Sequence, residues 1–590
     1  CYNRAMNMKK ELEIAVDKVL KGLGITKPSF RLEYPENPEH GDFSCNAAMV
    51  YAKELKLAPK ILAEKIVAEF NKGIPSHIDA VSVAGPGFIN FKIKARVFAE
   101  YITTIAAGDG EYGWGTRDAG QNILIEYTDP NIFKVFHIGH LMSNSIGESL
   151  SRLLQATGTN VTRLCYPSDI GLHIAKSIWA MKMHVADIPT EDSSIQEKTD
   201  FLGKMYVEGT RSYDENPEAK SAIDALNKVL YEKSDQHVNE LYAKGREWSL
   251  AHFELLYKTL GTKFDAYLFE SDMAPIGMNI VRAHIGKVFQ ESEGAIIFKG
   301  EDHGLPPSGD GSARKARGLH TRVFINSHGL PTYETKEMGL NMTKFKQYPQ
   351  TDQSIVITAN EQNDYFRVVL KALSLIDENV GTKTKHIGHG MLRFASGKMS
   401  SRTGKVITAE ALLSDIRGLV MEKIADRELS DTEKEEIAEI VALGAIRYTI
   451  LRQSIGGDVI FDSAASISFE GDSGPYLQYA AVRANSILEK GRFTPKHAKS
   501  PVLPEQVTLL ERLISRFPDI VERARVEYAP QAVANYLIAL AAEFNSYYAS
   551  HQIISNTDPL SSYRLALTQA FLTTMKNGLW LLGISVPKKM

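Results

Sequence analysis

Cysteine is the residue that this 590-residue sequence most clearly lacks, since only Cys1, Cys45 and Cys165 occur. Three scattered cysteines cannot build the disulfide framework of a small secreted protein or a cysteine-rich zinc site. They are typical of a reducing compartment, so we expect a cytoplasmic protein without a resident metal.

Long apolar runs are also missing. No stretch reaches the roughly 18 consecutive apolar residues that a membrane-spanning helix requires, so no membrane partner is expected. The start of the chain lacks the basic, apolar and small-residue order of a secretory signal. Residues 1–7 precede Met8, which reads like a natural start, and the fold prediction leaves them out.

Neither sign of charge dominates. The 68 Lys and Arg residues nearly balance 71 Asp and Glu residues, which gives a formal net charge of −3. Such a chain can still bind RNA through local basic surfaces, so its charge neither supports nor excludes a nucleic-acid partner. Apolar residues make up 44% of the chain, as in ordinary globular proteins, and the length predicts about three to five domains.

The first predicted domain covers residues 8–110 and is a small α+β unit. Helical periodicity runs from 9 to about 70 with a break at 22–40. Two strands follow, at 80–84 and 88–91, joined by a Gly-Pro-Gly turn.

The second predicted domain, residues 111–395, alternates strands with helices. A strand at 123–127, a helix at 141–157 and a strand at 161–166 form a β-α-β unit, and a helical insertion follows at about 185–262. Further strands are predicted at 295–298, 323–326, 354–358 and 386–394. This order is typical of an α/β protein with a doubly wound, Rossmann-type parallel sheet.

The remainder is predicted to be helical. Residues 396–470 form a polar loop and connecting helices, and Ser430-Asp-Thr-Glu433 within them has the form of a helix capping box. Residues 471–590 are predicted to be an all-α bundle.

The tetrapeptide His-Ile-Gly-His occurs twice, at 137–140 and at 386–389. The first copy follows a predicted strand and opens a helical segment, where unpaired N–H groups and the positive end of the helix dipole suit a phosphate. Gly139 would let a base or ribose approach the backbone closely. A simple helix cap, with one buried and one solvated histidine, would have the same sequence.

The second copy lies nine residues before the loop Lys398-Met-Ser-Ser-Arg402, in a glycine-interrupted run that we interpret as a strand. Cations in such a loop can neutralise charge that develops in phosphoryl or nucleotidyl transfer. A solvated surface loop would look the same.

The first tetrapeptide and the late lysine loop together resemble the signatures of the class I aminoacyl-tRNA synthetases. Further segments are similar to the arginyl-tRNA synthetase family and extend the resemblance over essentially the whole chain from Met8. They are Glu126-Tyr-Thr-Asp-Pro-Asn131, Lys134-Val-Phe-His137, Tyr333-Glu-Thr-Lys-Glu337, Gln362, Gly474-Pro-Tyr-Leu-Gln-Tyr479, Leu582-Gly-Ile-Ser-Val-Pro587, His40-Gly-Asp-Phe43 and Gly85-Pro-Gly-Phe-Ile-Asn90. The resemblance implies attachment of L-arginine to tRNA(Arg) through an arginyl-adenylate, with ATP and accompanying Mg²⁺. We expect the protein to be a monomer.

Roles at the ATP site come from the same resemblance. The implied catalytic residues are Lys134, His137, His140, Lys398 and Arg402. The implied ATP contacts are Gly139, Asp169, Gly171, Met391, Leu392 and Ser400. Ser401 stands where the family loop has a second lysine, and Lys134 is expected to replace that cation; His173 stands in place of a glutamine. His386 and His389 are expected to be structural, on a strand whose Gly390-Met-Leu392 backbone faces adenine.

Arginine recognition should depend on carboxylates, because a carboxylate meets the planar guanidinium fork with two hydrogen bonds and an ammonium cannot reproduce that geometry. The implied arginine contacts are Glu126, Asn131, Glu270, Tyr333, Glu337 and Gln362, and Glu337 replaces the usual aspartate. A surface salt bridge is the alternative role for each glutamate. Tyr479 and Arg483 are the implied tRNA contacts in the anticodon-binding bundle, and the first domain is implied to contact the outer corner of the tRNA.

Two other functions stay open. A small-molecule nucleotidylyltransferase shares the histidine motif and the fold, but it predicts neither a C-terminal helical bundle nor a lysine loop at this place. A catalytically inactive synthetase-like protein that only binds RNA is the second, and the intact Lys134, His137, His140 and Lys398 speak against it.

Overall fold

The structure is a computed structural model that describes residues 8–35, 37–303, 319–394, 407–494, 498 and 501–590. The chain divides into two compact units. One comprises Cys1–Gly115, Tyr479–Val521 and Tyr536–Gly578; the other comprises Thr116–Gln478, Glu522–Asn535 and Leu579–Met590. No helix within the described ranges combines the length and apolar character that a membrane crossing needs.

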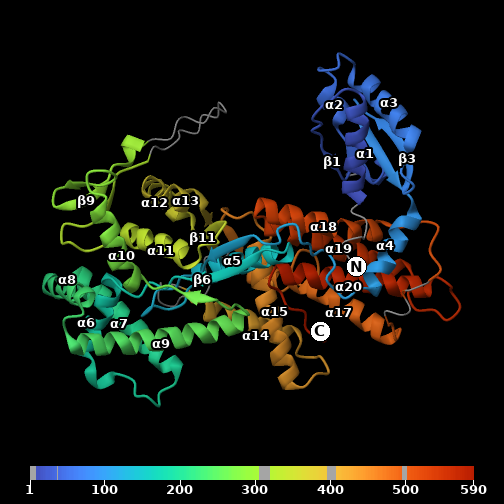
Figure 1. Cartoon of the computed structure of the whole chain (residues 1–590). Coiled ribbons are helices and arrows are strands. Elements are labelled where there is room, and N and C mark those ends of the chain that lie inside the picture. The colour runs from blue at the N-terminus through green and yellow to red at the C-terminus, as the bar shows by residue number, and fades with distance from the viewer. Residues whose placement is uncertain (1–7, 36, 304–318, 395–406, 495–497, 499–500) are drawn as a thin grey trace. The chain divides into compact units, whose positions relative to one another are not determined.

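The N-terminal part of the first unit is an α+β fold around a four-stranded antiparallel sheet of order β1-β2-β4-β3 (Figure 1). Its elements are α1 (Met8–Gly22), β1 (Leu32–Glu33), β2 (Phe43–Cys45), α2 (Ala47–Tyr51), α3 (Pro59–Phe70), β3 (Ile78–Ala84), β4 (Phe88–Ile93) and α4 (Ala95–Ala107). The predicted hairpin is confirmed by β3 and β4. The continuous helical reading up to Phe70 is wrong at β2, because three residues are too few to show a strand period.

Four long helices close the chain, as predicted: α17 (Gly474–Lys490), α18 (Leu509–Glu527), α19 (Pro530–Ser550) and α20 (Ser561–Leu581). Most of their inward positions are apolar and fully buried, including Leu537, Phe544 and Phe571, and the rings of Phe544 and Phe571 stack at 3.8 Å.

The second unit is built on a five-stranded sheet of order β12-β11-β5-β6-β7 in which every pairing is parallel. Its strands are β5 (Asn122–Glu126), β6 (Asn160–Cys165), β7 (Ala266–Tyr267), β11 (Gln353–Ala359) and β12 (Thr384–His389). Chain order reverses between β5 and β11, which is the arrangement of a doubly wound sheet, and ligands of such sheets bind beyond the carboxyl ends of the strands at that reversal. The predicted fold class is confirmed.

Helices cover this sheet: α5 (Ile138–Ala156), α6 (Leu172–Met183), α10 (Glu270–Ala283), α11 (Tyr333–Gln347), α12 (Asn363–Ile376) and α13 (Glu378–Lys383). Two glycines let α10 and α11 cross closely. A Cβ at Gly277 would clash with the Thr335 carbonyl, and one at Gly339 would clash with the Met273 carbonyl. The crossing brings acidic residues of the two helices into one neighbourhood.

Two predicted strands do not belong to the parallel sheet. Residues 295–298 and 323–326 lie instead in a separate antiparallel sheet of β8 (Gln290–Ser292), β9 (Ala295–Phe298) and β10 (Arg322–Ile325). Their apolar faces pack on a local cluster that includes Phe289, Phe298 and Phe324. Four-residue apolar strands look alike in either sheet, so local pattern assigned them wrongly.

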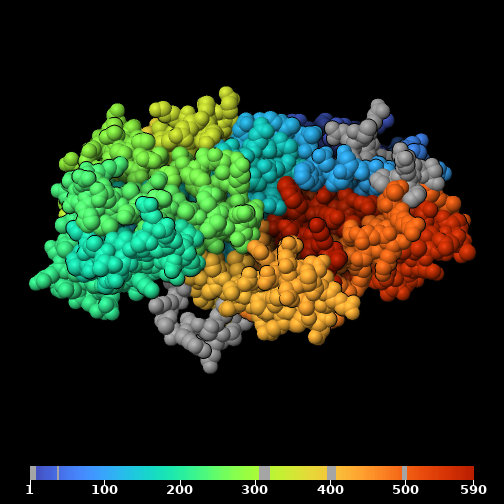
Figure 2. Space-filling model, turned by 90° about the horizontal axis from the view of Figure 1, so that it is seen from below, coloured from blue at the N-terminus to red at the C-terminus, as the bar shows by residue number. Residues whose placement is uncertain are grey.

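The predicted helical insertion is confirmed as α7 (Ile195–Glu215), α8 (Pro217–Glu232) and α9 (Gln236–Leu260), and α14 (Ala409–Lys423) and α15 (Asp431–Leu451) follow later in the chain. In Figure 2 the insertion, in teal and green, lies beside α14 and α15, in amber. The His252 imidazole of α9 meets the Glu410 carboxylate of α14 at 2.6 Å. A short parallel pair, β13 (Leu392–Phe394) with β14 (Val459–Phe461), connects the strand region to α15.

Candidate functional site

The site lies beyond the carboxyl ends of β5 and β6. The loop that follows β5 has an unusual backbone, because Thr128, Asp129 and Phe133 all have positive φ (82°, 41° and 63°) without being glycine. Backbone strain of this kind persists where surrounding contacts impose it, and it gathers at functional sites. Here the Tyr166 N–H donates to Asp129 at 2.7 Å and the Phe133 N–H donates to Ser249 at 3.0 Å.

The first histidine tetrapeptide forms the N-terminal cap of α5. His137 is the N-cap residue, and its Nδ1 accepts the Gly139 N–H at 3.1 Å. The His140 Nδ1 in turn accepts the His137 N–H at 3.3 Å, and the two rings stack with centroids 3.7 Å apart. Each ring thus uses Nδ1 as an acceptor, which assigns the proton to Nε2.

Both imidazoles are neutral near pH 7. Burial lowers the pKa of His137, and the positive charge of Lys134 lowers it further. Burial lowers the pKa of His140 well below its usual range, with added effects of His137 and Lys134. The pair therefore presents two neutral Nε2–H donors, which suits an anion without requiring a buried imidazolium.

Lys134 lies three residues before the cap. Its ammonium sits 4.8 Å from the centre of the Tyr206 ring of α7, a cation–π contact with the insertion. Its charge also acts on His137, His140 and His173, so it belongs to the same electrostatic neighbourhood.

Two buried ion pairs lie at the other side of the strand ends. Lys344 of α11 pairs with Glu126, the last residue of β5, and Lys336 of α11 pairs with Glu270, the first residue of α10. All four side chains are less than a tenth exposed. Because a buried charge is costly without a partner, each lysine offsets part of the cost of burying its carboxylate. Burial nevertheless raises the pKa of Glu270, and the charge of Lys336 opposes that rise.

Glu337 is a buried carboxylate of the same cluster without such a partner. No ion pair links it to a Lys or Arg of the described chain, and its Oε2 accepts only a 3.2 Å hydrogen bond from the Asn341 amide. Burial, with the negative charge of Glu126, raises the pKa of Glu337 to about 8. Below that pH the free protein keeps Glu337 protonated, and an incoming cation would favour its ionised form.

Three other predicted arginine contacts lie around this cluster. Tyr333, at the start of α11, is 58% exposed, and its ring carries the Lys336 ammonium at 4.3 Å. Asn131 makes a β-bridge to Ser168, and Gln362 ends the short 3-10 helix η6 (Asn360–Gln362) on the exposed surface after β11. The structure thus brings Glu126, Glu270 and Glu337 together as buried groups and leaves Tyr333 and Gln362 accessible.

Asp169, a predicted ATP contact, is fully buried and binds residues of both α9 and α10. Its carboxylate accepts hydrogen bonds from the Ser271 N–H (2.8 Å), the Ser271 hydroxyl (2.8 Å), the Tyr242 hydroxyl (3.0 Å) and Arg246 Nε (3.2 Å). Gly171, with φ of 131°, caps α6, and the buried His173 ring lies 3.2 Å from the Ser168 carbonyl. Burial lowers the pKa of His173 to about 3, so this histidine is neutral.

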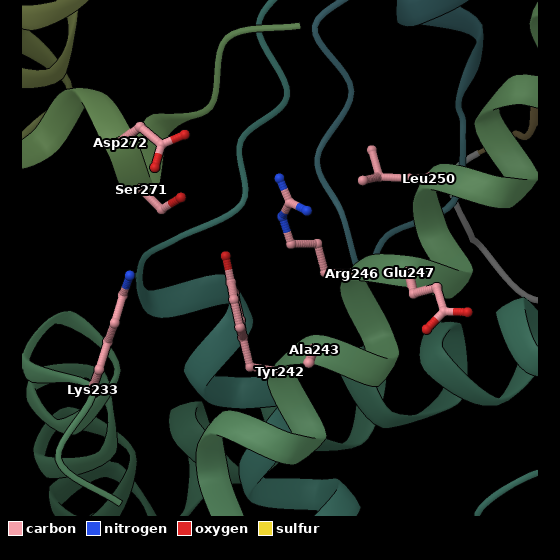
Figure 3. Close-up of a pocket in the computed structure, with 8 residues that line it drawn as sticks. All are labelled: Lys233, Tyr242, Ala243, Arg246, Glu247, Leu250, Ser271 and Asp272. Carbon is pink, nitrogen blue, oxygen red and sulfur yellow. The ribbon is translucent and has the colours of Figure 1, made fainter. Parts of the chain in front are cut away.

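A pocket of about 510 Å³ lies beside Asp169 (Figure 3). It opens between α9 and the start of α10, and Tyr242 and Arg246 point into it from α9. Its lining residues are Lys233, Tyr242, Ala243, Arg246, Glu247, Leu250, Ser271 and Asp272. Because Tyr242, Arg246 and Ser271 all bind Asp169, the pocket wall is tied to the loop after β6.

The second histidine tetrapeptide is the end of β12, as predicted. His386 stacks on Phe366 with ring centroids 4.0 Å apart and lies 2.8 Å from the Thr358 hydroxyl. His389 is buried, with Nδ1 2.7 Å from the Gly390 carbonyl. Met391 is exposed and Leu392 is buried at the start of β13.

The lysine loop falls outside the described residues, so Lys398, Ser400 and Arg402 have no assigned position. Its far end is anchored, because the Ile138 N–H of α5 donates to the Ile407 carbonyl and the Ala409 N–H donates to the Phe136 carbonyl. The chain thus leaves the loop beside the histidine cap.

In the other unit, the Arg483 guanidinium lies over the rings of Tyr479 (4.7 Å) and Tyr548 (5.6 Å) and donates to Asn545.

Sequence reasoning missed Lys336 and Lys344 as site residues. On α11 ten residues between Glu334 and Lys344 are buried although many are polar, and no amphipathic stripe marks them. A lysine directly before a candidate glutamate was the one available signal.

Comparisons with known proteins agree along the whole chain. Family models match at residues 102–463 (tRNA synthetases class I (R), catalytic domain), 477–590 (DALR anticodon binding domain) and 6–93 (Arginyl tRNA synthetase N terminal domain). The chain is 30% identical over 590 residues to the arginine--tRNA ligase of Halothermothrix orenii, covering 99% of this chain and all of that protein. It is 29% identical over 589 residues to the arginine--tRNA ligase of Clostridium beijerinckii, covering 99% and 98%. The arginyl-tRNA synthetase structure of Thermus thermophilus superposes with a TM-score of 0.78 at 23% identity over 99% of this chain and 100% of that one, which shows the shared fold.

Proposed function

Because this chain belongs to the class I arginyl-tRNA synthetases, we propose that its buried carboxylates recognise the guanidinium of arginine while its stacked histidines and Lys134 bind the ATP phosphates. The chain is an arginine–tRNA ligase that uses ATP. The arginine carboxylate attacks the α-phosphorus of ATP, which gives arginyl-adenylate and diphosphate. A terminal tRNA hydroxyl then takes the arginyl group and AMP leaves.

The observation that carries the arginine assignment is Glu337, a buried carboxylate without a cation. Lysines of the chain already neutralise Glu126 and Glu270, whereas Glu337 has only Asn341. An incoming guanidinium supplies a positive charge that stabilises the Glu337 carboxylate and two parallel N–H donors. We propose that Glu270 and Glu126, paired with Lys336 and Lys344, set the electrostatic potential of the pocket. Glu337 contacts the guanidinium directly.

The other arginine contacts follow from their places around the cluster. Tyr333 covers the entrance, since it is exposed and carries the Lys336 ammonium on its ring. Asn131 and Gln362 hold the amino and carboxylate groups of the amino acid, because both lie at strand ends on either side of the chain reversal.

On the phosphate side, the reaction needs preorganised donors and charge rather than a covalent enzyme intermediate. His137 and His140 donate Nε2–H bonds to phosphate oxygens, and Lys134 supplies the cation that Ser401 cannot. Lys398, Ser400 and Arg402 add donors from the loop that ends at the cap. Gly139, Gly171, Met391 and Leu392 border the nucleoside, and Asp169 acts by fastening α9 and α10 to the loop after β6.

Magnesium is assigned to ATP rather than to the protein. No three His, Cys, Asp or Glu side chains of the described chain gather closely enough to hold a metal ion. No step above depends on a metal ion held by the protein.

The tRNA contacts are assigned to both ends of the chain. Tyr479 and Arg483 would stack on anticodon bases, which are single-stranded and favour aromatic and guanidinium partners. Residues 8–110 would contact the body of the tRNA, 111–395 the reactants, 396–470 the phosphates, and 471–590 the anticodon. We propose that the protein is a monomer in the cytoplasm. The buried, free thiols of Cys45 and Cys165 are consistent with a reducing compartment.

The direct test is aminoacylation of tRNA with labelled arginine by the full chain. Acid-precipitable arginyl-tRNA that depends on ATP is the expected result. Binding of tRNA without charging would instead identify an inactive RNA-binding protein and refute the assignment.

A further inference from the structure

Tyr166 carries a buried hydroxyl without a hydrogen-bond partner. The residue directly follows β6, so it lies at the carboxyl end of a strand next to β5. Its side chain is only 6% exposed, and no described residue offers a partner to its Oη. Buried polar groups are nearly always satisfied, and an exception points to a group that the free protein does not contain.

The surroundings of this hydroxyl are acidic. Burial raises the pKa of Tyr166 well above the usual range, and the negative charges of Glu270, Glu337 and, more weakly, Glu126 raise it further. The phenol therefore stays protonated throughout the range in which the enzyme works. It has one donor and free acceptor capacity beside the carboxylate that lacks a cation.

Two other buried tyrosines of the same unit, Tyr127 directly after β5 and Tyr257 of α9, do not share this condition. The Tyr127 hydroxyl donates to Glu148 at 2.8 Å, and the Tyr257 hydroxyl lies 3.7 Å from the Cys165 sulfur. The unpaired state is thus a property of the Tyr166 position rather than of buried tyrosines in this fold.

A guanidinium presents five N–H donors and no acceptor. A carboxylate such as Glu337 takes two of them, and the rest need acceptors inside the same buried space, since an unpaired donor there is costly. We propose that the Tyr166 hydroxyl accepts a hydrogen bond from the guanidinium of bound arginine and so helps to select arginine over lysine. This inference rests on the proposed function and adds a recognition residue to its arginine pocket.

The test is Tyr166→Phe, which removes one oxygen and keeps the ring. The KM for arginine in tRNA charging should rise about 10- to 100-fold, the range for one hydrogen bond to a charged group, while kcat changes only a few-fold. Because the lost hydroxyl has no partner in the free protein, the melting temperature without arginine should stay level or rise. The stabilisation that arginine gives in a thermal melt should shrink.

Tyr127→Phe is the matched control, since it removes a hydroxyl that is bonded to Glu148. It should lower the melting temperature and leave the KM for arginine unchanged. A KM within twofold of wild type for Tyr166→Phe, with wild-type enzyme charging tRNA normally, would overturn the inference and leave the proposed function intact. Failure of the wild type to charge tRNA would refute the proposed function instead.

Discussion

At the scale of single residues, we expect arginine binding to depend on pH through Glu337. Its pKa of about 8 means that the free protein holds this carboxyl neutral below that pH, whereas the guanidinium needs the carboxylate. Affinity for arginine should therefore rise roughly tenfold per pH unit as pH approaches 8 and level off above it. Calorimetry between pH 6 and 9 measures this, and binding at pH 7 should release close to one proton.

Glu337→Gln is the control for that profile. The variant should bind arginine weakly with no dependence on pH near 8. Because the raised pKa means that the folded state holds a proton that the unfolded state loses above its lower pKa, this group contributes stability that falls as pH rises towards about 8. The Gln variant should accordingly be the more stable protein at pH 9. A pH-independent wild-type affinity would contradict the assignment of Glu337.

Lys134 is the second residue whose replacement should have a large effect on the reaction. Replacing it with alanine removes a cation beside the two cap histidines, and the rate of adenylate formation should fall about 10²- to 10³-fold. Lys176→Ala is a matched control, since that lysine also lies on a tyrosine ring, 4.4 Å from the centre of Tyr213. Diphosphate exchange measures both. Equal rates for the two variants would show that Lys134 does not supply the positive charge of the loop lysine that Ser401 replaces.

Sequence motifs identified individual site residues, but they did not show which of those residues form ion pairs. Glu270 and Glu337 follow from the resemblance. The pairing of Glu270 with Lys336 joins α10 to α11, and the pairing of Glu126 with Lys344 joins β5 to α11, so both connect residues far apart in the sequence. No local pattern records such a contact, so the lack of a cation beside Glu337 could be recognised only in the folded chain.

At the scale of elements, the two histidine tetrapeptides have different structural roles and give a paired experiment. His137→Asn keeps a good N-cap residue for α5 but removes the Nε2–H donor. Stability should change by less than about 1 kcal/mol, while kcat for adenylate formation falls about 10²- to 10³-fold.

His386→Asn changes the same position in the second copy, on β12. It removes the stack on Phe366, so the protein should melt at a lower temperature, yet kcat should stay within a few-fold of wild type. Melting curves and diphosphate exchange for both variants separate the two roles. A large loss of kcat in His386→Asn with a normal fold would show that β12 contributes its histidines to the reaction.

Helices and strands could be predicted from hydrophobic periodicity and from capping and turn residues. The neighbours of each strand in a sheet were harder to predict. The capping box at Ser430–Glu433 is formed as expected, and the strand reading of 386–389 is confirmed. Residues 295–298 and 323–326 were predicted as strands but assigned to the wrong sheet. A strand's partner depends on long-range packing, here the cluster around Phe289 and Phe324, which alternation of residues does not encode.

At the scale of the whole molecule, Arg447 joins distant parts of the second unit. This fully buried residue of α15 donates to the carbonyls of Leu260, at the end of α9 (2.6 Å), and of Gly583, near the end of the chain. The Ser149 hydroxyl of α5 also donates to the Leu581 carbonyl at 2.8 Å. The last residues of the chain are thus part of the unit that holds the histidine cap.

Arg447→Met should therefore cost about 3 kcal/mol or more, because it leaves buried carbonyls unpaired. Arg452→Ala provides the comparison on the same helix end: its ion pair with Asp472 is partly exposed and should be worth at most about 1 kcal/mol. Urea unfolding followed by fluorescence measures both. Similar midpoints for the two variants would argue that the C-terminal segment is not bound as tightly as its contacts indicate.

A crystal structure with bound L-arginine would show whether Glu337, a buried carboxylate without a paired cation, recognises the guanidinium. We expect the guanidinium nitrogens within hydrogen-bond distance of both Glu337 carboxylate oxygens and of Tyr166 Oη, with Lys336 still paired to Glu270. A guanidinium that lies away from Glu337, or that displaces Lys336 to bind Glu270 alone, would contradict this expectation.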